Sequence, residues 1–289
     1  MPALTSAVML YGFSLLYGFS GTTRLAAFAG SLPLGLGLIF LVLVGLGFKV
    51  SAVPFHYWAP DVYEGAPAPI TSFVATVSKG AMFALLLRYF ATMDIQNYRP
   101  LDMMFTVVAI ASMFIGNLLA LLQNNVKRIL AYSSIAHLGY LLVAFLASGE
   151  LRVTAVTYYL VAYFVTTLGA FGVVTVLSGK ERDADTLSDY NGLFRSRPWV
   201  AGVFTAMLLS LAGIPLTAGF IGKFYVLAAG AGSALWLLVI ILIINSAIGL
   251  FYYLRIVIVM YAQSSAVSAA AGARLSLIGA VVLVVLTGL

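Results

Sequence analysis

Three lysines in apolar stretches are the first candidates for chemistry in this sequence. Lys49, Lys79 and Lys223 each lie inside a run of hydrophobic residues. A lysine at the centre of a bilayer costs on the order of 3 kcal/mol. Burial can lower the pKa of a lysine by several units from its ordinary value of about 10.4, so a desolvated lysine can load and release a proton at physiological pH. The three lysines therefore predict proton transfer.

A lysine near the end of a membrane helix can instead extend to the lipid headgroups. The neighbouring residues argue against that alternative. Glycines precede Lys49 and a proline follows it within residues 45–54, and glycines and a proline precede Lys223 within residues 213–223. Helix breaks at membrane depth are tolerated inside protein or beside a water-filled cavity, and paired breaks indicate an ion site. Lys79 lies about ten residues, or roughly 15 Å, into its apolar run, near mid-membrane.

Histidine and uncharged polar residues also occur within the apolar runs. His137 lies near the middle of its run, where it can relay a proton or simply bond a neighbouring hydroxyl. Because three buried lysines occur in the same chain, we favour the relay. Other polar residues could hold relay waters, although helix–helix hydrogen bonds are their commoner role. These residues are Ser112, Asn117, Thr166, Thr167, Asn245 and Ser246.

Five further polar residues are expected to have structural roles. We expect His56 to lie at a helix end in contact with solvent, and Asp61 and Glu64 to cap a proline-rich turn. Lys127 and Arg128 begin an apolar run, a position where basic residues mark membrane topology.

The composition requires that these residues be positioned by membrane helices. Hydrophobic residues make up 63% of the 289 residues and charged residues 8%, whereas a soluble domain carries about 25% charged residues. Unbroken apolar runs such as residues 235–244 lack the alternation of a β-barrel. The sequence predicts an all-α, multi-pass bundle with nine spans, at about residues 2–20, 34–54, 70–92, 101–122, 128–147, 153–178, 199–229, 235–261 and 272–289. We expect one transmembrane domain over residues 1–289 and, because both ends fall in apolar runs, a fragment of a longer protein.

Several kinds of chemistry are excluded by what the sequence lacks. There is no cysteine, which excludes disulfides and thiolate metal sites, and no phosphate-binding loop, metal-ligand cluster or nucleophile–base pair. We therefore expect no cofactor or metal in this chain. The net charge of +6 is scattered, which suits loop topology better than nucleic-acid binding. Basic residues favour the side that holds residues 127–128 and 179–198, and we place that side, with residues 55–69, in the cytoplasm.

Four stretches resemble a known family of membrane proteins. They are FKVSAVPFHYWAPDVYEGAPAP at residues 48–69, ATVSK at 75–79, KRILAYSSIAHLGY at 127–140 and LAGIPLTAGFIGKFY at 211–225. All four are similar to the antiporter-like membrane subunits of proton-pumping NADH:quinone oxidoreductase (respiratory complex I). The variants VYEGAP and GFIGKF are most similar to the subunit N subfamily. The resemblance extends from the first apolar run to the last.

The resemblance implies an antiporter-like fold of fourteen helices with two inverted five-helix repeats. Helices six to fourteen would be present, and five upstream helices would be missing. Lys49 then matches the lysine of the broken seventh helix, Lys79 that of the eighth and Lys223 that of the broken twelfth, while His137 falls on the tenth. Family members carry an acid on the fifth helix that pairs with the seventh-helix lysine. This sequence has no acid within an apolar run, which again indicates truncation.

We therefore expect a proton-translocating membrane subunit of NADH:quinone oxidoreductase. Protons would move through Lys49, Lys79, His137 and Lys223. In the order that the resemblance implies, Lys79 loads from the cytoplasm, Lys49 is switched by the missing acid, and Lys223 passes the proton onward. NADH, FMN, iron–sulfur clusters and quinone would be handled by partner subunits, including paralogous antiporter-like subunits, in a bacterial inner membrane.

Two alternatives remain open on the sequence. The first is a subunit of a multisubunit sodium/proton antiporter or of a membrane-bound hydrogenase, which share this fold. The second is a structural subunit that does not pump, although three buried lysines would be costly in such a protein.

Overall fold

The computed structural model describes residues 2–22, 43–90, 95, 98–179 and 182–262. Every regular element in this part of the chain is helical. In chain order the elements are α1 (Pro2–Ser20), a helical segment at 43–50, α4 (Trp58–Gly65), α5 (Ala68–Phe73), a π-helical turn (Val74–Ser78), α6 (Lys79–Tyr89), α7 (Arg99–Leu121), α8 (Val126–Leu146), α9 (Leu151–Leu177), a 3-10 turn (Leu187–Tyr190), α10 (Leu193–Ser196), α11 (Pro198–Ala212), α12 (Ala218–Gly232) and α13 (Trp236–Tyr261).

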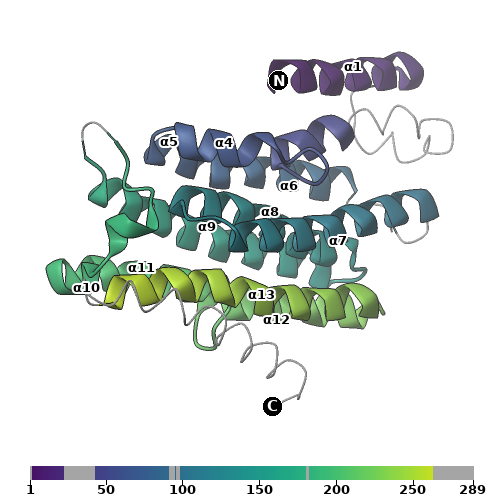
Figure 1. The fold of residues 1–289 in the computed structure, drawn as a ribbon. Helices are drawn as coiled ribbons and strands as arrows, with labels where there is room; N and C mark the ends of the chain where they lie inside the picture. Colours follow the sequence, from purple (N-terminus) through teal and green to yellow (C-terminus); the bar gives the residue numbers. More distant parts are fainter. Residues whose placement is uncertain (1, 23–42, 91–94, 96–97, 180–181, 263–289) are drawn as a thin grey trace.

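Helix α8 lies at the centre of the bundle (Figure 1). It is 94% buried along its apolar length, because α4, α7, α9, α12 and α13 all pack against it. Helix α7 approaches α8 closely, since a methyl group added to Gly116 on α7 would lie 2.6 Å from the backbone nitrogen of Ala136 on α8. Small residues permit such close contact between membrane helices. Polar side chains on α8 are therefore surrounded by protein and not by lipid.

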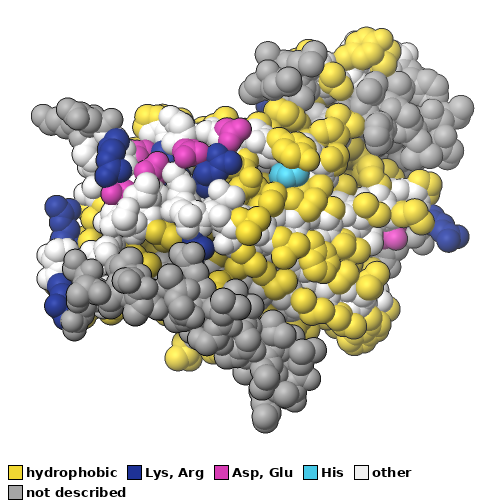
Figure 2. Space-filling view, in the orientation of Figure 1, with side chains coloured by type: hydrophobic (Ala, Val, Ile, Leu, Met, Phe, Trp, Pro, Cys, Tyr) yellow, Lys and Arg dark blue, Asp and Glu magenta, His cyan; other side chains and the backbone are white. Residues whose placement is uncertain are grey.

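The outer helices present apolar side chains on the surface of the bundle. Val107 on α7, Val165 on α9 and Ile243 on α13 are all more than half exposed. Figure 2 shows hydrophobic side chains over much of the visible face, with most of the visible charges gathered at the end that holds α5 and α10. Among the described residues, five helical spans are long and apolar enough to cross a membrane, namely α5 to α6, α7, α8, α9 and α13. The described part of the chain is therefore an all-α membrane protein.

Two helices are broken where the sequence predicts breaks. The segment at 43–50 ends before Ser51, whose φ is 64°, and α4 begins only at Trp58. Helix α11 is followed by Gly213, with a φ of 83°, and by Leu216, with a φ of 74°, before α12 begins. Glycine adopts this left-handed backbone without strain. The predicted breaks beside Lys49 and before Lys223 are confirmed.

The predicted spans agree with the helices to different degrees. The spans predicted at 70–92, 101–122, 128–147, 153–178 and 235–261 match α5 to α6, α7, α8, α9 and α13 within a few residues. The span at 199–229 is divided into α11 and α12, of 15 residues each. The span at 2–20 is α1, the span at 34–54 is described only from residue 43, and the span at 272–289 lies outside the described residues. The total of nine spans stays a prediction.

A turn of π-helix immediately precedes Lys79. Helix α5, the turn at Val74–Ser78 and α6 follow one another without interruption, so together they form one span. A π-helical turn winds the chain more widely than the α-helix and is frequent at functional sites. The turn therefore sets the direction in which the Lys79 side chain leaves its helix.

Candidate proton-transfer site

Lys79, the first residue of α6, is buried against α4 and α8. Its side chain is 4% exposed, and its ammonium donates a hydrogen bond of 2.7 Å to the Ser134 hydroxyl on α8. The ammonium also lies 5.8 Å from the centre of the Tyr63 ring on α4, in the arrangement of a cation–π contact. The prediction that Lys79 is buried in protein is confirmed by this environment.

Lys223 is buried at the break between α11 and α12. Its ammonium donates hydrogen bonds of 2.6 Å to the carbonyl of Ala212 and 2.7 Å to the Ser246 hydroxyl. Ala212 is the last residue of α11, where unpaired carbonyls carry the negative end of the helix dipole. The Tyr140 ring on α8 lies 5.3 Å from the ammonium. The broken helix therefore creates a binding place for a positive charge inside the bundle.

Gly213 makes room for Lys223. A methyl group added at this position would lie 2.7 Å from Cδ and 3.0 Å from Nζ of Lys223. The left-handed backbone thus favours glycine here, and a larger residue would displace the Lys223 side chain. Residues 212–223 therefore supply the carbonyl at the end of α11, the space beside Gly213 and the Lys223 ammonium.

His137 lies between two tyrosine hydroxyls at the centre of α8. Its Nδ1 lies 2.6 Å from the hydroxyl of Tyr159 on α9, and its Nε2 lies 3.1 Å from the hydroxyl of Tyr253 on α13. A neutral imidazole donates from one nitrogen and accepts at the other, so each tautomer can satisfy one hydroxyl as donor and one as acceptor. Such an imidazole is suited to accept a proton on one side and release one on the other.

One face of α8 connects the three buried basic groups. Ser134, His137 and Tyr140 follow one another at intervals of three residues, and residues three apart lie on the same face of a helix. Ser134 bonds Lys79 at one end of this face, and Tyr140 contacts Lys223 at the other. Six residues of helix span about 9 Å. The structure therefore brings Lys79, His137 and Lys223 into one line.

A small cavity joins His137 to Lys223. It is bordered by both residues and by polar groups of α9 and α11, including Tyr159, Thr166 and Ser210. Its free volume is about 10 Å³, close to the minimum for one water molecule. A water here would have several polar partners, so the cavity can support a proton step between the two residues.

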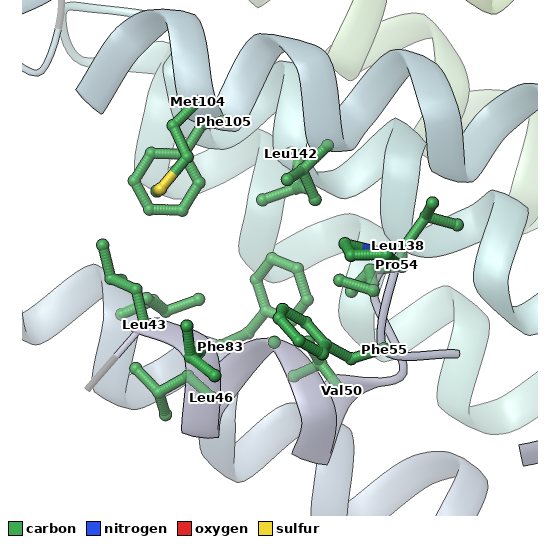
Figure 3. Close-up of a pocket in the computed structure, with 16 residues that line it drawn as sticks. Leu43, Leu46, Val50, Pro54, Phe55, Phe83, Met104, Phe105, Leu138 and Leu142 are labelled. Atoms are coloured by element: carbon green, nitrogen blue, oxygen red, sulfur yellow. The ribbon is translucent and has the colours of Figure 1, made fainter. Parts of the chain in front are cut away.

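Lys49 does not join this line in the described part of the chain. Its side chain is only partly buried, contrary to the expectation of a buried lysine, and among the described residues it has no hydrogen bond or ion pair. The segment at 43–50 borders an apolar cavity of about 210 Å³, which is also lined by residues 52–55 and by residues of α6, α7 and α8 (Figure 3). Leu46, Val50 and Phe83 are among the residues that point into it. Lys49 is not among the residues that line this cavity.

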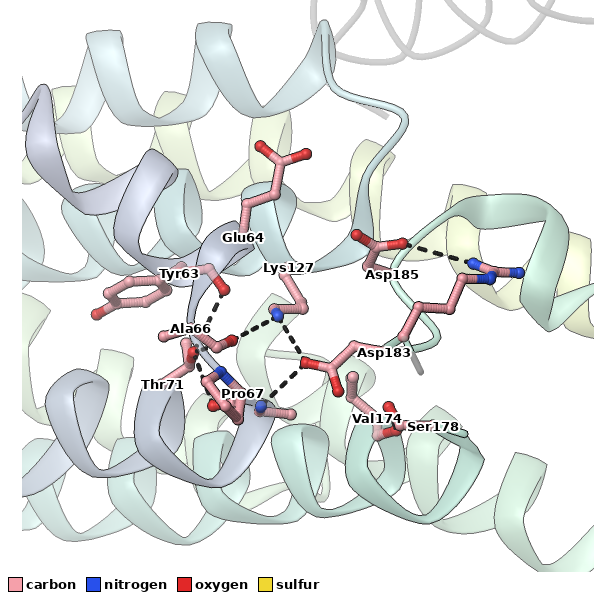
Figure 4. A network of polar contacts seen from close by, with 12 residues as sticks. Tyr63, Glu64, Ala66, Pro67, Thr71, Lys127, Val174, Ser178, Asp183 and Asp185 are labelled. Atoms are coloured by element: carbon pink, nitrogen blue, oxygen red, sulfur yellow. Dashed lines mark hydrogen bonds and ion pairs between the residues drawn. The ribbon is translucent and has the colours of Figure 1, made fainter. Parts of the chain in front are cut away.

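Lys127 has a larger structural role than a topology signal. It is 1% exposed, and its ammonium donates bonds of 2.7 Å to the carbonyl of Ala66 and to the carboxylate of Asp183 (Figure 4). The same carboxylate oxygen accepts a bond of 3.0 Å from the backbone N–H of Ala68. The ion pair therefore holds the end of α4 and the beginning of α5 together.

The carboxyl group of Asp183 titrates at lower pH than a free aspartate. Partial burial by itself would raise its pKa, but the hydrogen bond and charge of Lys127 outweigh burial. Bonds from Ser178 and from the N–H of Ala68 act in the same direction, so the pKa of Asp183 lies below its ordinary value. The carboxyl group of Asp183 is therefore ionised at neutral pH.

The roles predicted for Asp61, Glu64 and His56 need correction. Asp61 and Glu64 do not cap a turn, since they lie within α4 and form ion pairs of 2.9 and 2.6 Å with Arg128. His56 is 2% exposed and not solvated, because the chain folds back between the segment at 43–50 and α4. Residues 55–69 and residues 182–189 do lie on the same side of the bundle, as predicted, because Asp183 bonds Ala68.

The uncharged polar residues mostly bond helices to one another or to their own backbone. Asn117 donates to Asn245 at 3.2 Å and to the Tyr140 hydroxyl at 2.9 Å, which links α7, α8 and α13. Ser112 accepts from the N–H of Val53. Only Ser246 bonds a predicted site residue, whereas Thr166 borders the cavity without contacting a lysine through a hydrogen bond.

Several residues of the site were not singled out from the sequence. These are Ser134, Tyr140, Tyr159, Tyr253 and Ser210. A signal for the first two existed, since they lie three residues before and after His137 and so share its helix face. The other three depend on which helices adjoin α8, which hydropathy does not indicate.

Comparison with known proteins identifies the family. Residues 1–249 match the family described as "NADH:quinone oxidoreductase/Mrp antiporter, TM". NADH-quinone oxidoreductase subunit N of Nitrosospira multiformis is 56% identical, with 90% of this chain and 56% of the relative covered. The chain spans about half the length of the curated relatives that it matches.

Solved structures agree with the sequence match. A chain of respiratory complex I from Thermus thermophilus is 36% identical, with a TM-score of 0.75 and coverage of 91% of this chain and 58% of that one. A chain of the Mrp complex from Dietzia sp. DQ12-45-1b is 25% identical, with a TM-score of 0.84 and coverage of 91% and 49%. The two broken helices thus lie in an antiporter-like fold, and this protein belongs to the NADH:quinone oxidoreductase/Mrp antiporter transmembrane family.

Proposed function

We propose that this chain forms the proton-conducting part of a membrane subunit of NADH:quinone oxidoreductase, of the subunit N type. The observation that carries the proposal is the line of Lys79, His137 and Lys223 along one face of α8. The similarity to subunit N proteins supports the choice of this enzyme over other members of the family. The residues 1–249 that match the family support one antiporter-like domain along the chain.

The proposed path begins at Lys79. The Lys79 ammonium releases a proton toward Ser134, His137 passes a proton between its tyrosine partners, and Lys223 accepts it across the small cavity. The carbonyl of Ala212 and the hydroxyl of Ser246 then stabilise the charged form of Lys223. Lys49 is proposed as the residue that switches the path by pairing with a carboxylate.

The redox reaction is proposed to occur in other subunits. NADH oxidation and quinone reduction would supply the free energy, and the cofactors would be bound by partner subunits of a complex in a bacterial inner membrane. Residues 55–69 and 179–198 would then face the cytoplasm. This chain contributes the membrane-embedded proton path and no redox step.

Proton uptake by membrane vesicles energised with NADH tests the proposal. Lys79→Ala and Lys223→Ala are expected to slow uptake by at least about tenfold, equivalent to about 1.4 kcal/mol on the barrier. Arg195→Ala is the matched control, because Arg195 is an exposed cation in the 179–198 loop. Native gels establish that the complex assembles. If both lysine variants assemble and pump at the normal rate, the chain is a structural subunit and the proposal fails.

A sodium/proton antiporter is the second candidate. The similarity to the Mrp complex chain, with its TM-score of 0.84, supports this second function. Such a protein would take up protons against a sodium gradient without NADH. Vesicles that show sodium-driven uptake, lost in the same lysine variants, would decide for the antiporter.

A further inference from the structure

Three buried hydroxyls near Lys79 make no hydrogen bond within the described residues. They are the hydroxyls of Tyr63 on α4 and of Tyr163 and Thr167 on α9. The residues are 0%, 6% and 3% exposed, respectively. Buried polar groups in native proteins are nearly always paired, so each exception needs an explanation. Three exceptions from two helices at one place indicate a common cause.

These hydroxyls gather around Ser134. Tyr63 and Tyr163 both interact with the Ser134 side chain, and Tyr163 also interacts with Thr167, although no direct bond of normal geometry forms. Ser134 itself accepts from Lys79 and donates 2.7 Å to the carbonyl of Ala131. Hydroxyls at this spacing can connect through a small rotation or a shared water. Lys79 therefore lies beside a group of rotatable hydroxyls.

Tyr163 extends from this group toward the other half of the site. Its ring centre lies 5.3 Å from that of His137, and Tyr163 borders the cavity that joins His137 to Lys223. Of the three residues with unpaired hydroxyls, only Tyr163 borders that cavity. Tyr163 thus lies between the Ser134 hydroxyl that bonds Lys79 and the cavity that Lys223 borders.

We propose that the Tyr163 hydroxyl carries the proton between Lys79 and the cavity that leads to Lys223. This inference rests on the proposed function. The Lys79 ammonium gives a proton to Ser134, whose hydroxyl passes its own proton to the Tyr163 oxygen. Tyr163 releases its phenolic proton into the cavity, where His137 takes up one proton and gives up another, and Lys223 accepts one proton there. Lys79 ends as a neutral amine, Lys223 as an ammonium, and both hydroxyls are neutral before and after.

Replacing Tyr163 by phenylalanine tests this role cleanly. The substitution removes one oxygen that forms no hydrogen bond, so the fold is expected to be preserved. Proton uptake in vesicles energised with NADH is expected to fall about tenfold, equivalent to about 1.4 kcal/mol on the barrier. The pH profile of uptake and its slowing in D2O are expected to change as well, and a packing role alone would move neither.

Tyr190→Phe is the matched control. Tyr190 is also fully buried, but its hydroxyl donates 2.7 Å to the carbonyl of Ala184 in the loop, away from the lysines. We expect this variant to lower the thermal stability of the complex and to leave the pH profile and the D2O effect unchanged. The two substitutions are chemically identical, so the comparison isolates the position of the hydroxyl.

Lys223→Ala, measured in the same vesicles, separates the two proposals. If Lys223→Ala pumps normally, the proposed function fails and with it the role of Tyr163. If Lys223→Ala loses uptake while Tyr163→Phe keeps its rate, pH profile and D2O effect, the role of Tyr163 alone is overturned. Loss of uptake in both variants, with normal uptake in Tyr190→Phe, supports both.

Discussion

At the scale of single residues, the site depends on where each lysine finds its hydrogen-bond acceptors. Lys79 uses a serine hydroxyl, whereas Lys223 uses a helix-end carbonyl and a serine. The lysines themselves could be predicted, because a charge in an apolar run is conspicuous in the sequence. Which hydroxyl each lysine bonds could not be predicted, although Ser246 was among the polar candidates, because Ser134 and Ser246 become partners only when α8 and α13 pack beside the lysine helices.

Gly213→Ala tests how closely the break is fitted to Lys223. A side chain at a left-handed position costs about 1–2 kcal/mol, and here the added methyl would also meet the Lys223 side chain. We expect a lower thermal unfolding temperature and slower proton uptake. Gly202→Ala is the control, since Gly202 lies in α11 with no atom near its added methyl. That control is expected to be neutral or slightly stabilising, and equal effects of the two substitutions would contradict the argument.

At the scale of elements, the α4–α5 junction depends on an ion pair from elsewhere in the chain. Lys127 bonds the carbonyl of Ala66, and Asp183 bonds the N–H of Ala68. The sequence pattern suggested only that Lys127 marks the cytoplasmic end of a span. Hydropathy could not show that the side chain is buried, because burial depends on the loop that carries Asp183.

Acid is predicted to loosen this junction. Because the folded pKa of Asp183 is below its unfolded value of 3.8, its stabilising contribution is complete above that value. The contribution is lost as the pH falls through the folded pKa. Hydrogen exchange at the N–H of Ala68, corrected for the intrinsic effect of pH, is expected to accelerate over that range.

Asp183→Asn provides the variant for this measurement. It keeps the shape of the side chain but leaves Lys127 without its opposite charge, so exchange at Ala68 is expected to be fast already at neutral pH. Glu150→Gln is the control, because Glu150 is an exposed acid at the other end of the bundle. If Asp183→Asn keeps the slow exchange of the parent protein at neutral pH, the ion pair does not hold the junction.

At the scale of the whole molecule, the outer surface carries apolar side chains, and the centre holds the buried lysines. Hydropathy predicted the long helices well, since five of the proposed spans meet the requirements of length and composition. Hydropathy placed α11 and α12 in one span, because the residues of the break at Gly213–Thr217 do not lower the mean hydropathy enough to mark a boundary. The arrangement of helices around α8 could not be predicted, as that requires the packing of faces that look alike in the sequence.

The lipid-facing surface gives a prediction at this scale. Ile243→Lys, on the exposed face of α13, is expected to reduce membrane insertion by about 2.5–3.5 kcal/mol on a translocon scale. Trp236→Lys is the control, since Trp236 begins α13 and a lysine there can extend to the headgroups. Insertion is measured by glycosylation of sites placed on either side of the span. Equal insertion of the two variants would show that Ile243 does not face lipid.

The long-range bond of Asp183 also has a consequence for biosynthesis. The helix that bears Lys79 begins at Ala68, but the acid that bonds its first N–H follows 115 residues later in the chain. At about 5–20 residues per second, a ribosome needs roughly 6–23 s to cover that distance. During this interval, α5 enters the membrane without its acid and Lys127, once made, is without its counter-charge. The helix that bears Lys79 is therefore fastened in place late, after α8 and α9 have already been synthesised.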